Sequence, residues 1–238
     1  MTTRRPTDPP PTSVGEPTSV ADLEPQYARW LHRLMAREAS ESPQEASERA
    51  AWHQEASDRE TRRQLELMRS SWVGAGVPKR LVTWIEAHPE PCGSAMVACR
   101  EFLTSGLEIL VLAGPPGCGK TTAAAWAVTQ HGRALMVDVA RLARTNRYDE
   151  GQMGRLETVA LLVIDDLGME AVHDRSTFPA LIDGLINARY ANARKTIVTT
   201  NLPAAAFRSA YGERIADRIR ECGRYVEISD PSYRRRQK

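Results

Sequence analysis

The feature that most constrains the fold is a short glycine-rich segment placed between two regular ones. Residues 114–121 read GPPGCGKT, the apolar run LEILVLA comes directly before them, and the alanine-rich stretch TAAAWAVTQ follows. A short apolar run is typical of a buried strand, and an alanine-rich stretch that soon meets a glycine is typical of a helix. The chain is therefore predicted to turn abruptly from a strand into a helix, and five of the eight turn residues are Gly or Pro.

The same segment fits the pattern G-x-x-x-x-G-K-[ST], which is associated with phosphate binding. The glycines let successive backbone N–H groups turn inward and leave room for a phosphate to approach closely. The following helix directs its positive end at the same place, and a lysine and a hydroxyl there suit the β- and γ-phosphates and Mg²⁺. An ordinary strand-to-helix turn is the alternative, and it needs the whole motif to arise by chance. The predicted nucleotide and metal site comprises Gly114, Pro115, Pro116, Gly117, Cys118, Gly119, Lys120, Thr121 and Thr122.

Further apolar runs alternate with helix-like segments along the rest of the chain. The runs at 134–140 (ALMVDVA), 159–166 (VALLVIDD) and 195–201 (KTIVTTN) are predicted strands, and 141–150 and 178–193 are predicted helices. Strands that are apolar throughout are buried on both faces. The pattern predicts an α/β fold with a doubly wound parallel sheet. The roughly 38 residues after the last of these strands are too few for a large separate lid domain.

Polar side chains end two of the predicted strands. Asp165 and Asp166 close the run LLVIDD, and Asn201 follows the run KTIVTT. In open α/β sheets the carboxyl ends of the strands lie beside the ligand crevice. We expect Asp165 to hold Mg²⁺, Asp166 to act as general base on the attacking water, and Asn201 to hydrogen-bond that water or the γ-phosphate. Ordinary turn roles are the alternative, but two adjacent carboxylates favour a nearby cation because like charges raise each other's pKa.

An arginine-rich helix is predicted close to the end of the sequence. In the segment 211–221 (YGERIADRIRE), Ile215 and Ile219 share one helix face, whereas Arg214 and Arg218 lie on another. One explanation of this pattern is a helix face exposed to solvent. The other is that one of the arginines reaches the γ-phosphate of a neighbouring subunit, for which a planar and permanently charged guanidinium is well suited.

The first 72 residues differ in composition from the rest. Residues 1–20 hold five prolines and almost no apolar side chains, which predicts a disordered tail. Residues 21–72 carry a few Trp, Leu and Met side chains at helical spacing on a charged background, too few for a core of their own. We predict that 21–72 is a helical region that binds a partner protein and that 73–238 is the main domain. A solvated helical extension is the alternative for 21–72.

The composition also argues against several classes of protein. The net charge is only +2, so any contact with nucleic acid must come from a local patch. The four cysteines form no C-x-x-C pair, which indicates neither a zinc site nor a disulfide framework. No run approaches the roughly 20 apolar residues of a membrane span. We expect a cytoplasmic protein that makes no contact with a membrane.

From about residue 74 to 236 the chain resembles the AAA+ ATPases of the DnaC/IstB type, which are bacterial and phage helicase loaders and ATP-binding helper proteins of transposons. The resemblance rests on GPPGCGKTT, LLVIDDLGME, TTN, GERIADRIR and the closing SYRRR. It implies an AAA+ P-loop NTPase fold with a short helical N-terminal extension, ATP and Mg²⁺ as cofactors, and self-association with ATP. By this resemblance Lys120 and Thr121 belong to the Walker A motif, Asp165 and Asp166 to Walker B, and Asn201 is sensor 1.

The same resemblance assigns roles to arginines. Arg218 matches the arginine finger, Arg214 is the nearby alternative, and Arg234 in SYRRR matches a sensor 2-like arginine. Most AAA+ proteins carry Asp-Glu at Walker B; here the second acid is Asp, one methylene shorter, so we expect slow hydrolysis that a partner stimulates. In loaders the region corresponding to 141–156 contributes to contact with single-stranded DNA. A solvated helix face is the alternative for its arginines, Arg141, Arg144 and Arg147.

These features leave three functions to compare. The first is a helicase loader that binds a DnaB-type replicative helicase and single-stranded DNA. The second is an IstB-type transposition helper that assembles on double-stranded DNA and recruits a transposase. The third, a small-molecule P-loop kinase, is disfavoured because Asn201 and Arg218 would have no role in it. We favour the loader because the short N-terminal region with its tryptophans suits docking to another protein.

Overall fold

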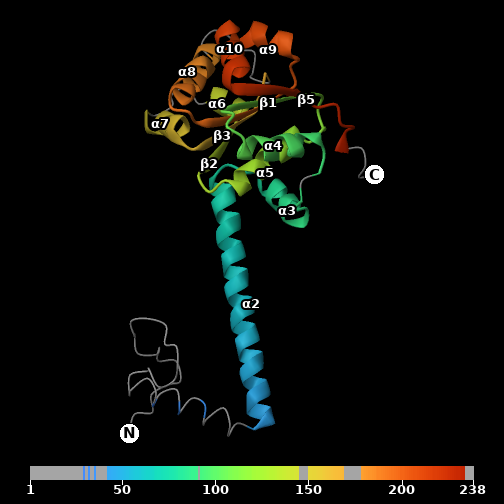
Figure 1. Cartoon of the computed structure of the whole chain (residues 1–238), viewed down its shortest axis with the longest axis vertical. Coiled ribbons are helices and arrows are strands. Elements are labelled where there is room, and N and C mark those ends of the chain that lie inside the picture. The colour runs from blue at the N-terminus through green and yellow to red at the C-terminus, as the bar shows by residue number, and fades with distance from the viewer. Residues whose placement is uncertain are drawn as a thin grey trace. The chain divides into compact units, whose positions relative to one another are not determined.

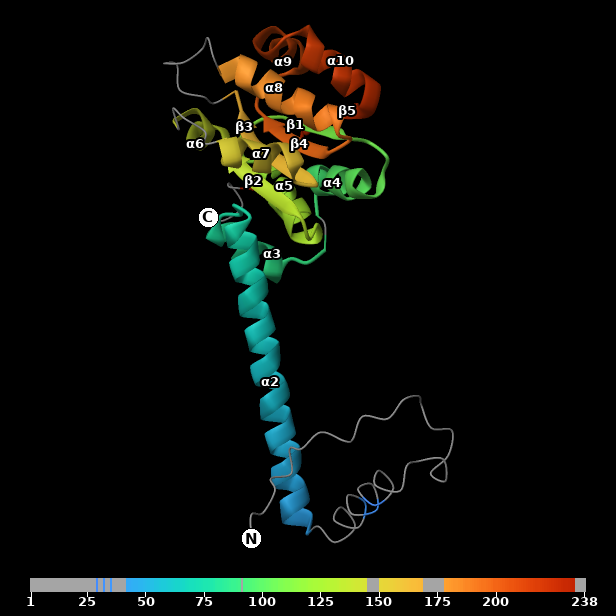
Figure 2. The same cartoon turned by 90° about the vertical axis from the view of Figure 1, so that its left-hand side faces the viewer.

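The computed structural model describes residues 42–90, 92–144, 150–168 and 178–233, together with the isolated positions 29, 32 and 35. The predicted disordered tail, residues 1–20, lies outside these ranges, as does most of 21–41. The chain divides into two compact units, Met1–Leu65 and Glu66–Lys238. Figures 1 and 2 show the chain from two directions.

Helix α2 (Pro43–Gly74) accounts for nearly all of the described part of the first unit and continues into the second. It begins at Pro43, where the fixed φ suits a helix and the missing N–H has no intrahelical partner to lose. Within the first unit its side chains are mostly exposed, Trp52 among them. A helix that buries so little apolar surface is stabilised largely by interactions between side chains one turn apart. Two such hydrogen-bonded pairs are Gln44–Glu48 and Gln54–Asp58. No helix in the described ranges is both long enough and apolar enough to cross a membrane.

The last turns of α2 belong to the second unit and are fixed to it by polar and apolar contacts. Arg69 donates from Nε and Nη2 to the two carboxylate oxygens of Glu86 on helix α3 (Lys79–Ala87), at 2.6 and 2.9 Å. Trp72 packs against the core cluster beneath this helix. The carbonyl of Ala75 then accepts from the N–H of Met136 (2.7 Å), which attaches the helix end to the edge of the sheet.

A sheet of parallel strands forms the centre of the second unit, in the order β2–β3–β4–β1–β5. The strands are β1 (Ile109–Ala113), β2 (Ala134–Asp138), β3 (Leu161–Leu167), β4 (Lys195–Thr200) and β5 (Gly223–Glu227). The chain passes from β1 to β2 at the far edge and returns through β3 to β4, which pairs with β1. It then crosses to β5, which pairs with β1 on its other side. The carboxyl ends of β3, β4 and β1 therefore lie next to one another, and ligands bind at such a place in open α/β sheets.

Helices cover both faces of the sheet, as Figures 1 and 2 show. One core cluster joins Leu110, Leu112 and Val163 to helices α3, α4 (Ser94–Thr104) and α5 (Lys120–Gln130). The alternate strand residues Val111 and Ile164 belong to a second cluster on the other face. That cluster includes residues of α6 (Val139–Arg144), α7 (Glu150–Thr158), α8 (Phe178–Ala191), α9 (Ala204–Tyr211) and α10 (Glu213–Cys222). The predicted doubly wound parallel sheet is confirmed.

Several elements differ from the sequence-based expectation. The strand predicted at 134–140 ends at Asp138, because Val139 already begins α6 and turns its side chain into the core. The helix predicted at 141–150 is instead the end of α6 and the start of α7, and residues 145–149 lie outside the described ranges. Three helices and a strand were not predicted at all: α3, α4, α9 and β5.

Two cations, the buried Arg189 and the half-buried Lys195, bind backbone carbonyls near the amino-terminal ends of the strands. Arg189 of α8 is completely buried and donates to the carbonyls of Leu156 (2.6 Å) and Val159 (2.9 Å) at the end of α7. Burial lowers the pKa of its guanidinium to about 10. The Lys195 ammonium donates to three carbonyls around the end of α4, those of Phe102, Ser105 and Leu107, at 2.8–3.0 Å. Both cations thus donate to carbonyls at or just beyond the end of a helix, where intrahelical donors run out.

Candidate functional site

The glycine-rich segment connects the end of β1 to the start of α5, as predicted. β1 ends at Ala113 and α5 begins at Lys120. The register of the sheet places Ala113 opposite Thr200, the last residue of β4. The N–H of Gly114 donates to the Thr200 carbonyl (3.2 Å), so the loop begins beside the end of that strand.

Lys120 forms most of the hydrogen bonds within this loop. Its ammonium donates to the carbonyls of Gly114 (2.8 Å) and Pro115 (3.0 Å) and to Oδ1 of Asn201 (3.0 Å). The sulfur of Cys118 lies 3.7 Å from the same nitrogen. The residue is only 5% exposed, and a buried ammonium needs such acceptors because burial without them is strongly unfavourable. Lys120 and Asn201, both predicted site residues, are thus brought into direct contact.

Asp165 is buried at the end of β3 in surroundings that disfavour its negative charge. Its pKa is raised to about 6, chiefly by burial and also by the charges of Asp166 and Asp138, whereas hydrogen bonds from Thr199 and Thr121 lower it in part. The Thr199 hydroxyl donates to Oδ1 of Asp165 at 2.7 Å. A cation beside this carboxylate would stabilise the ionised form.

The neighbouring acid, Asp166, takes a different position. Its φ is 59°, and the register between β3 and β4 shifts between Ile164 and Leu167. The N–H of Asp166 donates to the Thr199 hydroxyl (2.9 Å) in place of a regular ladder bond. A bulge of this kind redirects a side chain at the end of a strand, and Asp tolerates positive φ better than most residues. One carboxylate is therefore buried, whereas the other faces the pocket beside the loop.

That pocket has a volume of about 610 Å³. Of the predicted site residues, those that line it are Pro116, Gly117, Gly119, Lys120, Thr121, Thr122, Asp166 and Asn201. Gly114 and Pro115 do not line it but present their carbonyls to Lys120, and Cys118 is buried within the loop. Arg234 lies outside the described residues. Residues from two strand ends and from the loop thus border the same pocket.

The pocket is also lined by residues that sequence reasoning missed. They are Trp84, His88, Cys92, Met96 and Tyr233. The rings of Trp84 and His88 are stacked, with centroids 4.4 Å apart and an interplanar angle of 12°. Aromatic and thioether groups next to a phosphate-binding loop suit a flat heteroaromatic base. An apolar stripe on α3 was the available sequence signal, but it does not indicate which cavity the helix borders.

Arg218 is not brought to this pocket. It lies on α10, is 8% exposed, and directs its guanidinium at α8. Nη2 donates to Oδ1 of Asn187, and Nη1 lies 3.7 Å from Oδ1 of Asp183. The guanidinium also lies 5.1 Å from the centre of the Tyr190 ring. Arg218 is therefore bound to α8.

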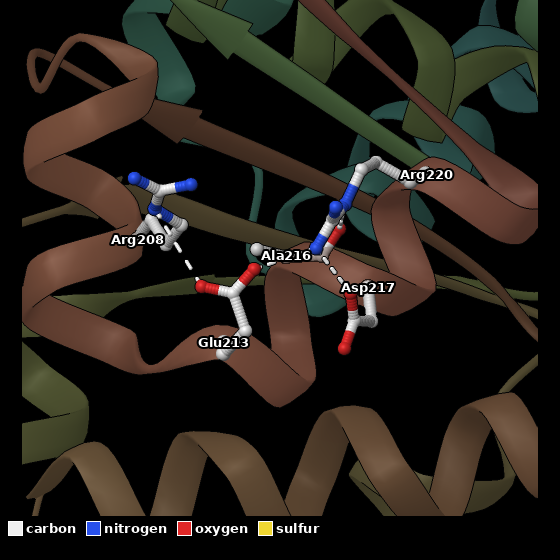
Figure 3. A network of polar contacts seen from close by, with 5 residues as sticks. All are labelled: Arg208, Glu213, Ala216, Asp217 and Arg220. Atoms are coloured by element: carbon white, nitrogen blue, oxygen red, sulfur yellow. Dashed lines mark hydrogen bonds and ion pairs between the residues drawn. The ribbon is translucent and has the colours of Figure 1, made fainter.

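Arg214 shares these partners but is far more accessible. It donates to Asp183 Oδ2 (3.2 Å) and Asn187 Oδ1 (2.9 Å), and 61% of its side chain is exposed. The other arginines near this helix form a separate surface network, shown in Figure 3. There Glu213 lies between Arg208 (3.6 Å) and Arg220 (2.6 Å). Exposed pairs of this kind contribute little to stability. The sequence also points to the arginines of the region 141–156, which are Arg141, Arg144 and Arg147. The side chains of the first two and the whole of Arg147 are outside the described residues.

The residues suited to a metal ion are few. Within the described ranges there is no group of three or more His, Cys, Asp or Glu side chains that could hold a metal. A magnesium ion bound with a nucleotide needs fewer protein ligands, because phosphate oxygens and water complete its octahedron. Thr121 and Asp165 are hydrogen-bonded to each other and offer a hydroxyl and a carboxylate, which are the oxygen ligands that Mg²⁺ prefers.

Comparisons with known proteins add to this picture. The replicative helicase loader DnaC of Buchnera aphidicola subsp. Acyrthosiphon pisum (strain APS) is 28% identical over 133 residues, which cover 50% of this chain and 53% of that protein. The uncharacterized protein YdaV of Escherichia coli (strain K12) is 30% identical over 145 residues, 56% of this chain and 57% of that protein. The chain thus spans about half the length of the curated relatives it matches.

Solved structures and a family model were also compared. The crystal structure of the DnaC helicase loader is 24% identical with a TM-score of 0.49, covering 59% of this chain and 93% of that one. The crystal structure of DnaI is 22% identical with a TM-score of 0.46, covering 57% and 79%. The model of the family described as IstB-like ATP binding protein matches residues 33–238, most of the chain. This match confirms the predicted resemblance to the DnaC/IstB type: the chain belongs to the IstB-like ATP binding proteins.

Proposed function

We propose that this chain is a helicase loader: an ATP-dependent protein that binds a hexameric replicative helicase of the DnaB type and delivers it to single-stranded DNA during replication. The observation that carries the proposal is the pocket, on which Lys120, Asp166 and Asn201 converge in a member of an ATP-binding family. Relatives named replicative helicase loader DnaC support the loading role. We assign the activity to the cytoplasm.

In this proposal ATP lies with its base against Trp84 and His88 and its phosphates over the glycine-rich loop. The stacked rings offer a flat face to the base. Lys120 exchanges its loop carbonyls for oxygens of the β- and γ-phosphates, which bind an ammonium more strongly because they are ionised. The N-terminal end of α5 faces the same oxygens and adds the positive end of its dipole.

Residues at the ends of β3 and β4 and at the start of α5 have separate roles in hydrolysis. Thr121 and Asp165 hold Mg²⁺, which when bound neutralises charge on the phosphates. Asp166 faces the pocket and accepts a proton from the attacking water, while Asn201 orients that water by a hydrogen bond. Asp166→Asn removes the base and keeps the shape, so turnover should fall by roughly 10²–10⁴ while ATP still binds. Asp165→Asn is the matched control, because it should weaken magnesium-dependent binding as well.

We propose further that an arginine from a neighbouring subunit completes the site when the protein self-associates with ATP. Neither Arg214 nor Arg218 lines the pocket of its own subunit, and both are bound to α8. Arg218 is the residue that matches the family motif, and Arg214 is the more accessible alternative. An arginine supplied in trans is typically worth about 10³–10⁵ in rate.

Subunit mixing tests this arrangement. Arg218→Ala and Lys120→Ala should each be inactive alone, and a mixture should regain part of the ATPase activity, because an intact interface can form between an arginine donor and a lysine owner. The same mixture with Arg214→Ala in place of Arg218→Ala decides between the two arginines. If neither mixture recovers activity, although all variants are folded and associate, the trans assignment is wrong.

We propose that residues 21–72 bind the partner protein. Trp52 is 54% exposed on a helix that buries little, and tryptophan is favoured at the centre of protein interfaces. A chain that begins at Glu66 keeps the contacts of Arg69 and Trp72, and should still bind ATP but no longer capture the helicase. Trp52→Ala in the full chain is the finer version of the same test. Unchanged capture by the shortened chain would contradict the assignment.

A second function is favoured by the name of the family itself, IstB-like ATP binding protein. In that case the protein assembles on double-stranded DNA and recruits a transposase. Two measurements separate the functions: capture of a DnaB-type helicase against capture of a transposase, and affinity for single-stranded against double-stranded DNA with ATP present. The loader requires the first result in both.

A further inference from the structure

A short segment that follows β5 lies against the glycine-rich loop. We call residues 228–233, ISDPSY, the C-terminal strap. The N–H of Ile228 donates to the Ala113 carbonyl (2.7 Å), and the N–H of Tyr233 donates to the Gly117 carbonyl (3.0 Å). Between them, the carboxylate of Asp230 accepts from the backbone N–H at the start of α4 (2.8 Å). The strap is thus held at both ends by the loop and its strand, and in the middle by a helix.

The glycines of the loop have their bare faces turned towards this strap. A Cβ at Gly114 would collide with the Ile228 carbonyl oxygen, and one at Gly117 would collide with the Ser232 hydroxyl. A Cβ at Gly119 would lie 3.3 Å from Cε2 of Tyr233, tighter than ordinary contact. From the sequence, these glycines are expected to leave space for a phosphate. At all three, the missing side chain leaves room for the strap.

The backbone bond from Tyr233 also bears on the direction of the loop's donors. In a trans peptide the C=O and the following N–H point in opposite directions. Because the Gly117 carbonyl points at the strap, the N–H of Cys118 points away from it. The Ala113 carbonyl is bound by the strap in the same way, and the N–H of Gly114 points instead at the end of β4. Fixing a carbonyl on one side of the loop therefore fixes a donor on the other.

Tyr233 also lines the pocket, as do Lys120 and Thr121. Its hydroxyl faces Gly93 and lies 3.5 Å from Asp230 Oδ2. One residue therefore contacts the loop from behind through its backbone and ring, and borders the space that the nucleotide would fill. The strap is a wall of the site as well as a support for it.

We propose that Ser232 and Tyr233 are positioning residues that hold the phosphate-binding loop in the conformation that binds ATP. The inference rests on the proposed nucleotide site and assigns the strap a role within it. The expected signature is a change in nucleotide affinity, and hence in KM, with kcat at saturating ATP little altered, because the strap touches neither Asp166 nor Asn201 through any described contact.

The first experiment compares two substitutions at Tyr233 in the chain of residues 1–238. Tyr233→Ala removes the ring, and we expect ATP and ADP to bind about tenfold more weakly, a change of about 1.4 kcal/mol. Tyr233→Phe keeps the ring carbons that face Gly119 and the backbone N–H, and should bind within about twofold of wild type. Equal affinity in all three proteins, or equal loss in both variants, would overturn the role given to the ring.

The second experiment is a double-mutant cycle between Gly117 and Ser232, read as ATP affinity by calorimetry. Gly117→Ala should weaken binding strongly, both because its φ of 91° strains alanine and because its Cβ meets Ser232. The backbone strain is common to both backgrounds and cancels in the cycle. In the Ser232→Gly background we therefore expect the penalty of Gly117→Ala to be about tenfold smaller, as for other residues in contact. Purely additive effects would overturn the proposal.

Wild type and Lys120→Ala serve as references in both experiments. If wild type binds no ATP, the nucleotide site itself is wrong and the role of the strap is wrong with it. If wild type binds and Lys120→Ala does not, while every strap variant binds like wild type and the cycle is additive, the site stands and only the strap inference fails. Thermal unfolding identifies any variant that has lost its fold. If Tyr233→Ala is such a variant, the double-mutant cycle between Gly117 and Ser232 tests the proposal on its own.

Discussion

Lys120 and Lys195 occupy opposite ends of the same sheet and bond to the same kind of acceptor. Lys120 lies at the carboxyl ends of the strands and donates to two loop carbonyls at 2.8 and 3.0 Å. Lys195 begins β4 at the other end and donates to three carbonyls at 2.8–3.0 Å, with Arg189 of α8 bonded similarly nearby. Hydrogen-bond geometry alone does not distinguish these cations.

The surroundings of these cations distinguish them. The acceptors of Lys195 and Arg189 include carbonyls around the ends of α4 and α7, which such a cation satisfies permanently. Lys120 lines the pocket, and its acceptors belong to a loop rather than to a helix end. Its flexible four-carbon stem allows the ammonium to change partners. A cation that borders a pocket is therefore a candidate for binding, whereas one bonded to the carbonyls of helix ends is a candidate for stability.

The largest effect is expected from removing the cation that borders the pocket. Lys120→Ala should abolish productive ATP binding and turnover, because the phosphates lose their mobile positive charge, and should shift the unfolding temperature little. Nucleotide binding by calorimetry and an ATPase assay measure the first part, and thermal unfolding measures the second. Normal hydrolysis by this variant would contradict the site as described.

At the other end of the sheet the expectation is reversed. Arg189→Met keeps much of the volume but leaves several buried carbonyls without a donor, so we expect a loss of roughly 3–5 kcal/mol in the free energy of unfolding. Urea unfolding measures this loss. The affinity of the folded variant for ATP should stay within about twofold of wild type. A large loss of affinity at unchanged stability would place Arg189 in the functional machinery instead.

At the pocket end of the sheet, ionisation of the buried carboxylate of Asp165 should lower the free energy of unfolding. Its pKa is raised to about 6, so the folded protein holds this proton more tightly than the unfolded chain does. The stability of wild type therefore decreases as pH rises through 6, and Asp165→Asn, which has no such proton, escapes the decrease. We expect the variant to be more stable at pH 7.5 by on the order of 2 kcal/mol, and the advantage to vanish towards pH 4.

The measurement is urea unfolding at several pH values in buffer with a chelator. With ATP and Mg²⁺ present the order should invert at neutral pH, because only wild type keeps the carboxylate for the metal and gains stability from binding. A variant that is never more stable than wild type would show that burial does not penalise the charge of Asp165.

Sequence reasoning succeeded where the signal is local. The strands around Val111, Ile164 and Val198 are apolar at nearly every position because both of their faces are buried, and such runs are visible without a structure. The glycine-rich loop is equally visible because its backbone requirements restrict residue type. Asn201 was predicted from its place after a strand, and the contact with Lys120 is what the shared edge of a parallel sheet produces.

It failed where the role of a residue arises from packing between distant segments. β5 lies at the edge of the sheet with mixed burial, so the segment GRYVE has no continuous apolar run. Tyr233 gains its role only because the chain after β5 passes behind the loop. In the segment SYRRR the sequence predicts a role only for Arg234, which lies outside the described residues. The base-binding part of the pocket was missed for the same reason.

The smallest expected effect concerns that part of the pocket. Trp84 presents a ring stacked on His88, and a base stacked on an aromatic side chain is typically worth about 1–3 kcal/mol. Trp84→Ala should therefore weaken ATP binding about tenfold, whereas inhibition of binding by inorganic triphosphate, which has no base, should be unchanged. Trp84→Phe is the matched control and should keep most of the affinity. Equal losses for ATP and triphosphate would mean that Trp84 supports the fold of α3 and does not contact the base, and would remove the aromatic end of the pocket from the proposed site.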